Sequence, residues 1–109
     1  MRSRDPLSEP YEVTQFVAEV GLRVRLMRLA RGLTQAELAE RADLSRQTLM
    51  AIEAGALASR LVDVARLLWA LDDTSLQSAM ATAAQDPAYQ EAARNGLSRI
   101  GSRRKKAVP

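Results

Sequence analysis

The chain has 109 residues, which is enough for one domain with extensions at its ends. It contains no cysteine and no histidine, which excludes disulfides, soft-metal sites, thiol nucleophiles and histidine acid–base chemistry. The 13 acidic residues are scattered without a pair at catalytic spacing, so we expect neither an enzyme nor a bound cofactor.

We expect a cytoplasmic protein that does not enter a membrane. The first twenty residues contain six charged side chains where a secretory signal would need an apolar stretch. The longest uncharged stretch, from Thr74 to Gln85, is too short and too polar to span a bilayer.

Basic residues are concentrated in two parts of the chain, although the net charge is only +3. Residues 21–46 carry six arginines against three acids, and residues 99–106 carry five basic residues and no acid. Outside Lys105 and Lys106 every basic residue is arginine, whose planar fork suits phosphates and guanine edges. A solvated surface with a solubilising tail would show the same pattern, so charge alone leaves the partner open.

Hydrophobic periodicity predicts an all-α fold. Residues 1–12 contain two prolines and are expected to form a flexible arm. Apolar positions at helical spacing predict a first helix over residues 13–31, weakened at Gly21 and terminated by Gly32.

Two short helices are predicted next. Thr34 and Glu37 form a capping-box pattern that opens the second helix. The third is expected from about residue 46 to 54, capped by Ser45 and ended by Gly55. The inner face of the second helix is expected to contain Ala36, Leu38, Ala39 and Ala42, and the third is anchored by Leu49 and Ile52.

The remaining chain is predicted to form a fourth helix over residues 60–71, a weaker one over 75–84 and a last one over 88–99. Ser59 is the expected cap of the fourth helix, and Asn95-Gly96 is expected to interrupt the last. The apolar stripe of the fourth helix is expected to be Leu61, Val64, Ala65, Leu68 and Leu71. The predicted domains are the arm 1–12, a DNA-binding domain 13–84 and a C-terminal extension 85–109 with a disordered basic tail.

The second and third predicted helices, joined by about three residues, have the arrangement of a helix-turn-helix. Their close packing requires a small residue such as Ala39, and the turn requires one that tolerates a positive φ, for which Asp43 is acceptable. Leu44 would fill the core at the turn. The side chains that the third helix would offer to a major groove are Arg46, Gln47, Thr48, Met50 and Ala51. By periodicity alone, an ordinary solvent-facing helix explains them somewhat better.

Three stretches between Gly21 and Leu71 resemble the lambda-repressor and Cro-like family of helix-turn-helix regulators, the XRE family. They are Leu33-Thr34-Gln35-Ala36-Glu37-Leu38-Ala39, Leu44-Ser45-Arg46-Gln47-Thr48 and Ile52-Glu53-Ala54-Gly55. The resemblance implies a compact bundle of about five helices that binds double-stranded DNA, as a homodimer on a palindromic operator.

The resemblance also implies roles for individual residues. Gln35 matches a glutamine that contacts a backbone phosphate and braces the recognition helix. Arg28 and Glu53 match a pair that joins the first helix to the end of the recognition helix, and Arg60 falls where the next loop meets the phosphate backbone. The expected DNA-binding residues are Thr34, Gln35, Ser45, Arg46, Gln47, Thr48, Met50, Ala51 and Arg60.

Two positions depart from the family pattern. Members often have glycine in the turn where this chain has Asp43, so the turn would be slightly strained or Asp43 would form a local hydrogen bond. A proline commonly follows the Gly55 position, whereas this chain has Ala56-Leu57-Ala58-Ser59. The resemblance therefore does not define the path of this loop or any phosphate contact from it.

The sequence favours a transcriptional regulator that acts as a repressor. A narrower hypothesis makes it the DNA-binding antitoxin of a toxin–antitoxin pair, similar to HipB-like antitoxins, with a toxin as protein partner. The alternatives are a protein-interaction module without specific DNA binding and a nonspecific RNA or nucleoid binder, against which the scarcity of aromatic residues counts. The tail, residues 95–109, either lies along DNA or docks a partner, and its apolar residues Leu97, Ile100 and Val108 favour the partner.

Overall fold

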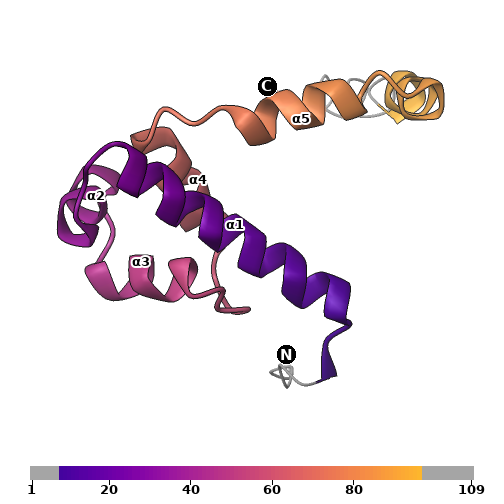
Figure 1. Ribbon diagram of the computed structural model, residues 1–109. Coiled ribbons are helices and arrows are strands. Elements are labelled where there is room, and N and C mark those ends of the chain that lie inside the picture. The colour runs from indigo at the N-terminus through magenta and orange to yellow at the C-terminus, as the bar shows by residue number, and fades with distance from the viewer. Residues whose placement is uncertain (1–7, 97–109) are drawn as a thin grey trace, which may run out of the picture. The chain divides into compact units, whose positions relative to one another are not determined.

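The computed structural model describes residues 8–96, and the chain divides into two compact units after Asp73. Every regular element in the described part is a helix, which confirms the predicted all-α fold (Figure 1). Helices α1 to α4 belong to the first unit, and α5 belongs to the second. The predicted arm up to residue 7 and the basic tail from residue 97 lie outside the described residues.

Helix α1 (Tyr11–Ala30) begins two residues earlier than predicted, so residues 11 and 12 are not part of an arm. Pro10 occupies the N-cap position with a φ of −55°. A proline fits at this end because the first backbone N–H groups of a helix have no partner within it. The helix ends as predicted, at Arg31 and Gly32, with Gly32 at a φ of +66°.

Helices α2 (Gln35–Ala42) and α3 (Arg46–Glu53) have the predicted caps. The Thr34 hydroxyl accepts the Glu37 backbone N–H at 3.1 Å, and the Glu37 carboxylate accepts the Thr34 backbone N–H at 3.0 Å. The hydrogen bond from the Thr34 backbone N–H, together with the Thr34 side chain and the charge of Arg41, lowers the pKa of Glu37, because each stabilises the charged carboxylate. Both short helices therefore begin where local side-chain chemistry places them.

The core of the first unit lies where α1 packs on α3, and α2 packs on both α3 and α4 (Leu61–Ala70). In Figure 1, α1 runs alongside the shorter helices of this unit. The largest fully buried side chains come from all four helices and the turn after α4: Val24, Leu38, Leu49, Leu67 and Leu71. Burial on this face supplies most of the stability of helices that would be marginal in isolation.

The buried faces of α2 and α4 differ from two predictions. Ala36 is exposed, because the face of α2 that meets the core contains Leu38, Ala39 and Ala42 instead. Likewise Leu61 is 83% exposed and Ala65 is also on the surface. Helix α4 packs through Asp63, Val64, Leu67 and Leu68.

The expected cap of α4 is also wrong. Arg60 is the N-cap residue, without a side-chain cap, and the Ser59 hydroxyl donates instead to the Ala56 carbonyl at 2.6 Å. The predicted apolar stripe of α4 was wrong at Leu61 and Ala65 because it assumed an entirely apolar inner face, whereas the carboxylate of Asp63 is buried beside Arg60.

The second unit contains α5 (Ser75–Ala83) and a helical stretch from residue 87 to 96, where the described chain ends. The predicted interruption at Asn95-Gly96 does not occur, because both residues are helical. Helix α5 has no buried residue, and it groups with the C-terminal unit rather than with the predicted domain 13–84. Among the described residues no helix is long and apolar enough to cross a membrane, and no acidic cluster is suited to a metal ion.

Candidate nucleic-acid interface

The turn between α2 and α3 is closed without glycine. Asp43 adopts the left-handed conformation, with φ 57° and ψ 47°, and its backbone N–H bonds to the Glu40 carbonyl at 3.1 Å. The next N–H, of Leu44, bonds to the Ala39 carbonyl at 2.9 Å. Leu44 is half-buried against the core, as predicted. Aspartate tolerates this conformation better than most residues, so the departure from the family glycine preserves the turn.

Helix α3 has one buried and one exposed face. Leu49 and Ile52 are buried, with 0% and 3% exposure. Thr48 is half-buried at the boundary. The exposed residues are Arg46, Gln47, Met50 and Ala51. All four belong to the predicted DNA-binding set, and their exposure shows that they are available to a partner.

The N-terminal turn of α3 is fixed by two contacts of Ser45. Its hydroxyl oxygen accepts the Thr48 backbone N–H at 3.0 Å and donates to the Thr48 hydroxyl at 2.8 Å. Thr34 and Ser45 are thus the N-caps of the two helices of the motif. The helix dipoles and N-terminal N–H groups make both of these ends favourable neighbours for an anion.

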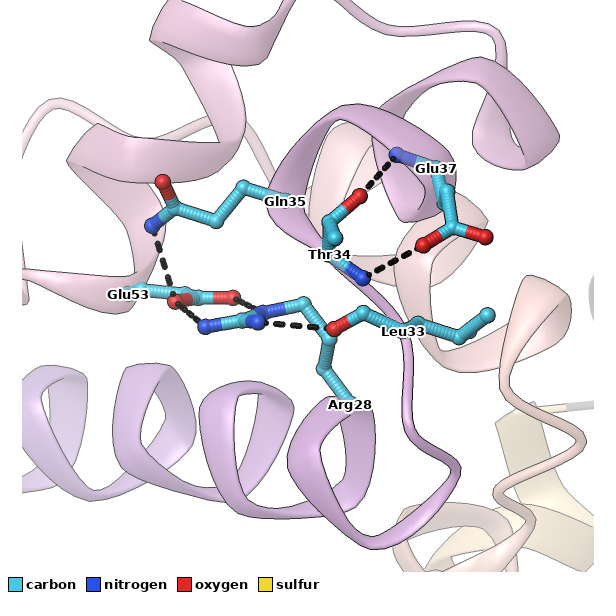
Figure 2. A network of polar contacts seen from close by, with 6 residues as sticks. All are labelled: Arg28, Leu33, Thr34, Gln35, Glu37 and Glu53. Atoms are coloured by element: carbon cyan, nitrogen blue, oxygen red, sulfur yellow. Dashed lines mark hydrogen bonds and ion pairs between the residues drawn. The ribbon is translucent and has the colours of Figure 1, made fainter.

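The C-terminal end of α3 is held by a network around Glu53, shown in Figure 2. The Arg28 guanidinium donates to both carboxylate oxygens of Glu53, at 2.7 and 3.0 Å, and to the Leu33 carbonyl at 2.9 Å. The Gln35 amide nitrogen donates to Glu53 at 3.3 Å. The pair expected between Arg28 and Glu53 is therefore present, and Gln35 is attached to it.

This network is well shielded from solvent, since the Arg28 and Glu53 side chains are only 10% and 5% exposed. The hydrogen bonds to Glu53 raise the pKa of Arg28, because they stabilise the charged guanidinium against the opposing effect of burial. Three parts of the domain (α1, the start of α2 and the end of α3) are thereby joined at one carboxylate. Such a pair fixes orientation more surely than it adds stability.

Gly21 places α1 against the backbone of α3. A Cβ atom at this position would overlap the Ile52 carbonyl oxygen and would lie 3.2 Å from that of Glu53. The sequence suggested only that this glycine weakens α1. Its position shows that the absence of a side chain lets two helices approach closely, and a glycine inside a predicted helix was the available signal.

Two further ion pairs were not predicted. Arg60 donates to both Asp63 carboxylate oxygens at 2.9 and 3.0 Å, and its own side chain remains 74% exposed. Arg23 donates to Asp73 at 2.7 and 3.1 Å. In both cases the hydrogen bonds to the carboxylate raise the pKa of the arginine. Arg60 and Asp63 are three positions apart, a spacing from which this pair could have been predicted. Arg23 and Asp73 are 50 positions apart, so the sequence offers no local signal for that pair.

A cavity of about 270 Å³ lies between α3 and the start of α4. Three predicted site residues line it: Thr48, Ala51 and Arg60. It is completed by residues outside the predicted DNA-binding set, namely Ile52, Ala56, Ala58, Ser59 and Asp63. Arg60 thus lies near α3 on the side of this cavity. Gln35 contacts the same helix elsewhere, at its last residue, Glu53.

The comparison with protein families agrees with this geometry. Residues 19–72 match the family model described as a helix-turn-helix domain. Searches of curated proteins and of solved structures gave no match. The chain therefore contains a helix-turn-helix domain, a fold whose ordinary role is to bind DNA, and the domain is XRE-like.

Proposed function

We propose that the protein is a sequence-specific transcriptional repressor that places α3 in the major groove of double-stranded DNA. The observation that carries this proposal is the division of α3 between a buried apolar face and an exposed face containing Arg46 and Gln47. Arginine can grip guanine and glutamine can grip adenine, each through two hydrogen bonds. We propose that it acts in the cytoplasm, as helix-turn-helix regulators typically do.

The phosphate backbone would be held on both sides of this helix. Gln35 stands at the start of α2, with one amide N–H bound to Glu53 and the second left for a phosphate. Arg60 keeps most of its guanidinium in solvent while Asp63 holds it. Thr34 and Ser45 present helix N-termini, and Met50 lies on the exposed face of α3.

The test is selection of a binding site from random duplexes, followed by fluorescence anisotropy on the selected site and on a scrambled one. Arg46→Ala should weaken the selected site by about 1–3 kcal/mol and relax its preference at one base pair. Arg46→Lys is the matched control, because it keeps the charge but loses the fork. It should therefore retain binding to scrambled DNA. Equal binding of wild type to both duplexes would instead indicate a nonspecific nucleic-acid binder, and binding to neither would indicate a protein-interaction module.

We further propose that the repressor is a homodimer on a palindromic operator. Trp69 is 71% exposed, so it is not part of the core, and Val62 is exposed on the same side of α4. In the second unit, Leu76 and Met80 lie on one side of α5, which buries nothing. Half-sites should be about 34 Å apart, one helical turn. A monomeric mass at micromolar concentration with one chain per operator would contradict this.

The narrower proposal is that the protein is an antitoxin. It is supported by the second unit, whose exposed Met80 and Tyr89 accompany an α5 without buried residues. Helices of this length are marginal in water without a partner. Co-expression with the product of the neighbouring gene should give a stable complex and relieve growth inhibition by that product. If the neighbouring product has no effect on growth, the antitoxin proposal is contradicted, while the repressor proposal is unaffected.

A further inference from the structure

We propose that the cavity between α3 and α4 receives the 5-methyl edge of a thymine in the operator, and that the methyl group of Thr48 recognises it. This inference rests on the proposed DNA binding and deepens it. Thr48 would then act in base reading through its methyl group rather than through a hydrogen bond. The cavity, of about 270 Å³, lies next to the exposed face of α3 that is proposed to enter the groove.

The first reason is that the hydroxyl of Thr48 is already engaged. Ser45 donates to it at 2.8 Å from the N-cap position, on the side of Thr48 toward the start of α3. Thr48 itself lines the cavity. Because this oxygen already accepts at the cap, Thr48 can still offer a ligand its methyl group and its own O–H. The apolar lining described next favours the methyl group, and thymine is the base that presents a methyl group in the major groove.

The second reason is that the other polar groups around the cavity also have partners within the protein. The Ser59 hydroxyl donates to the Ala56 carbonyl at 2.6 Å, and the Asp63 carboxylate accepts two hydrogen bonds from Arg60. The surface that remains is formed largely by the methyl groups of Ala51, Ala56 and Ala58. Such a lining favours an apolar group over one that needs hydrogen bonds.

The third reason is charge. Arg60 stands at the rim with a side chain that is 74% exposed, while the Asp63 side chain beneath it is only 6% exposed. The guanidinium is bound to this carboxylate but belongs to an exposed side chain, so it can still meet an anion. A thymine on a DNA strand brings a phosphate close to its methyl group, so a nucleotide satisfies both the apolar lining and the cation.

The experiment uses the full chain and its selected operator, in which single thymines are replaced by deoxyuridine. This change removes one methyl group and leaves the hydrogen-bonding edge intact. At one position in each half-site it should weaken binding about fourfold, the equivalent of burying roughly one methylene, and at other positions it should have little effect.

Two variants of Thr48 identify the reader. Thr48→Ser keeps the hydroxyl and loses the methyl, so the preference for thymine over uracil at that position should disappear. Thr48→Val keeps a methyl and loses the hydroxyl, so the preference should remain. Each variant is judged by the ratio of its affinities for the thymine and the deoxyuridine operators. A general loss of folding or of α3 capping lowers both affinities and cancels from this ratio.

The outcomes separate this inference from the proposed function. The thymine site would be overturned if the protein bound its operator specifically but lost no affinity with deoxyuridine at any position. It would also be overturned if the fourfold loss of affinity persisted in Thr48→Ser. Both results would leave the repressor proposal unaffected. The first result would also be expected if the cavity held a small effector. Absence of any sequence preference in the original selection would overturn both.

Discussion

The substitution Gly21→Ala tests the idea that α1 and α3 are held at backbone contact distance. Alanine should stabilise the interior of a helix by about 1 kcal/mol relative to glycine. Here the new Cβ would overlap the Ile52 carbonyl oxygen, and both that oxygen and the one of Glu53 belong to the backbone, so neither can rotate away. Forcing an extra carbon into such a contact typically costs about 1–3 kcal/mol. We therefore expect a net loss of stability despite the better propensity.

Thermal unfolding followed by circular dichroism measures this balance, because about 1 kcal/mol shifts the Tm of a domain of this size by roughly 4–8 °C. Gly96→Ala is the matched control, since that glycine is also helical but a Cβ there meets nothing within 4 Å. Gly21→Ala should also lower the affinity for the selected operator, because α3 must move away from α1. A Tm at or above that of wild type, with unchanged DNA affinity, would refute the close approach.

Three further predictions follow from the network and the termini. Replacing either Arg28 or Glu53 by an apolar residue should cost about 3 kcal/mol, and replacing both should cost less than the sum; additive losses in the double-mutant cycle would show that the pair is uncoupled. Because the pKa of Glu37 is lowered in the folded protein, the stability that its carboxylate contributes is present above pH 4.5 and is lost as the pH falls through the folded pKa. The Tm difference between wild type and Glu37→Gln should therefore shrink in acid. A difference that does not change with pH would contradict the capping box. If the proposed toxin exists, truncation after residue 96 should abolish its binding and leave the salt dependence of DNA binding unchanged. A slope of log affinity against log salt that is lower by about two to four units would instead place the tail along DNA.

Local chemistry made much of the first unit predictable. The capping box at Thr34, the cap at Ser45 and the turn at Asp43 each depend on residues within a few positions of one another. These contacts determine where α2 and α3 begin and how they are joined. The Arg28–Glu53 pair spans 25 positions and was accessible only through resemblance to a family, since nothing local links the two residues.

The features that the sequence did not reveal depend on where a helix face meets other helices. Leu61 and Leu67 are both leucines on α4, yet one is 83% exposed and the other fully buried. Apolar periodicity assigned the wrong one to the core because the observed inner face includes a charged residue, Asp63. A buried carboxylate is acceptable there only because Arg60 neutralises it, and hydrophobicity patterns do not register that compensation.

These contacts also explain how so short a helix could serve as the proposed reader of DNA. An isolated helix of eight residues, the length of α3, would be largely unfolded in water. Here its first turn is fixed by Ser45, its middle is buried through Leu49, and its last residue, Glu53, is bound by Arg28. A reader ordered before it meets DNA loses little conformational entropy on binding. Loosening either end should therefore weaken sequence preference even where no base contact is touched.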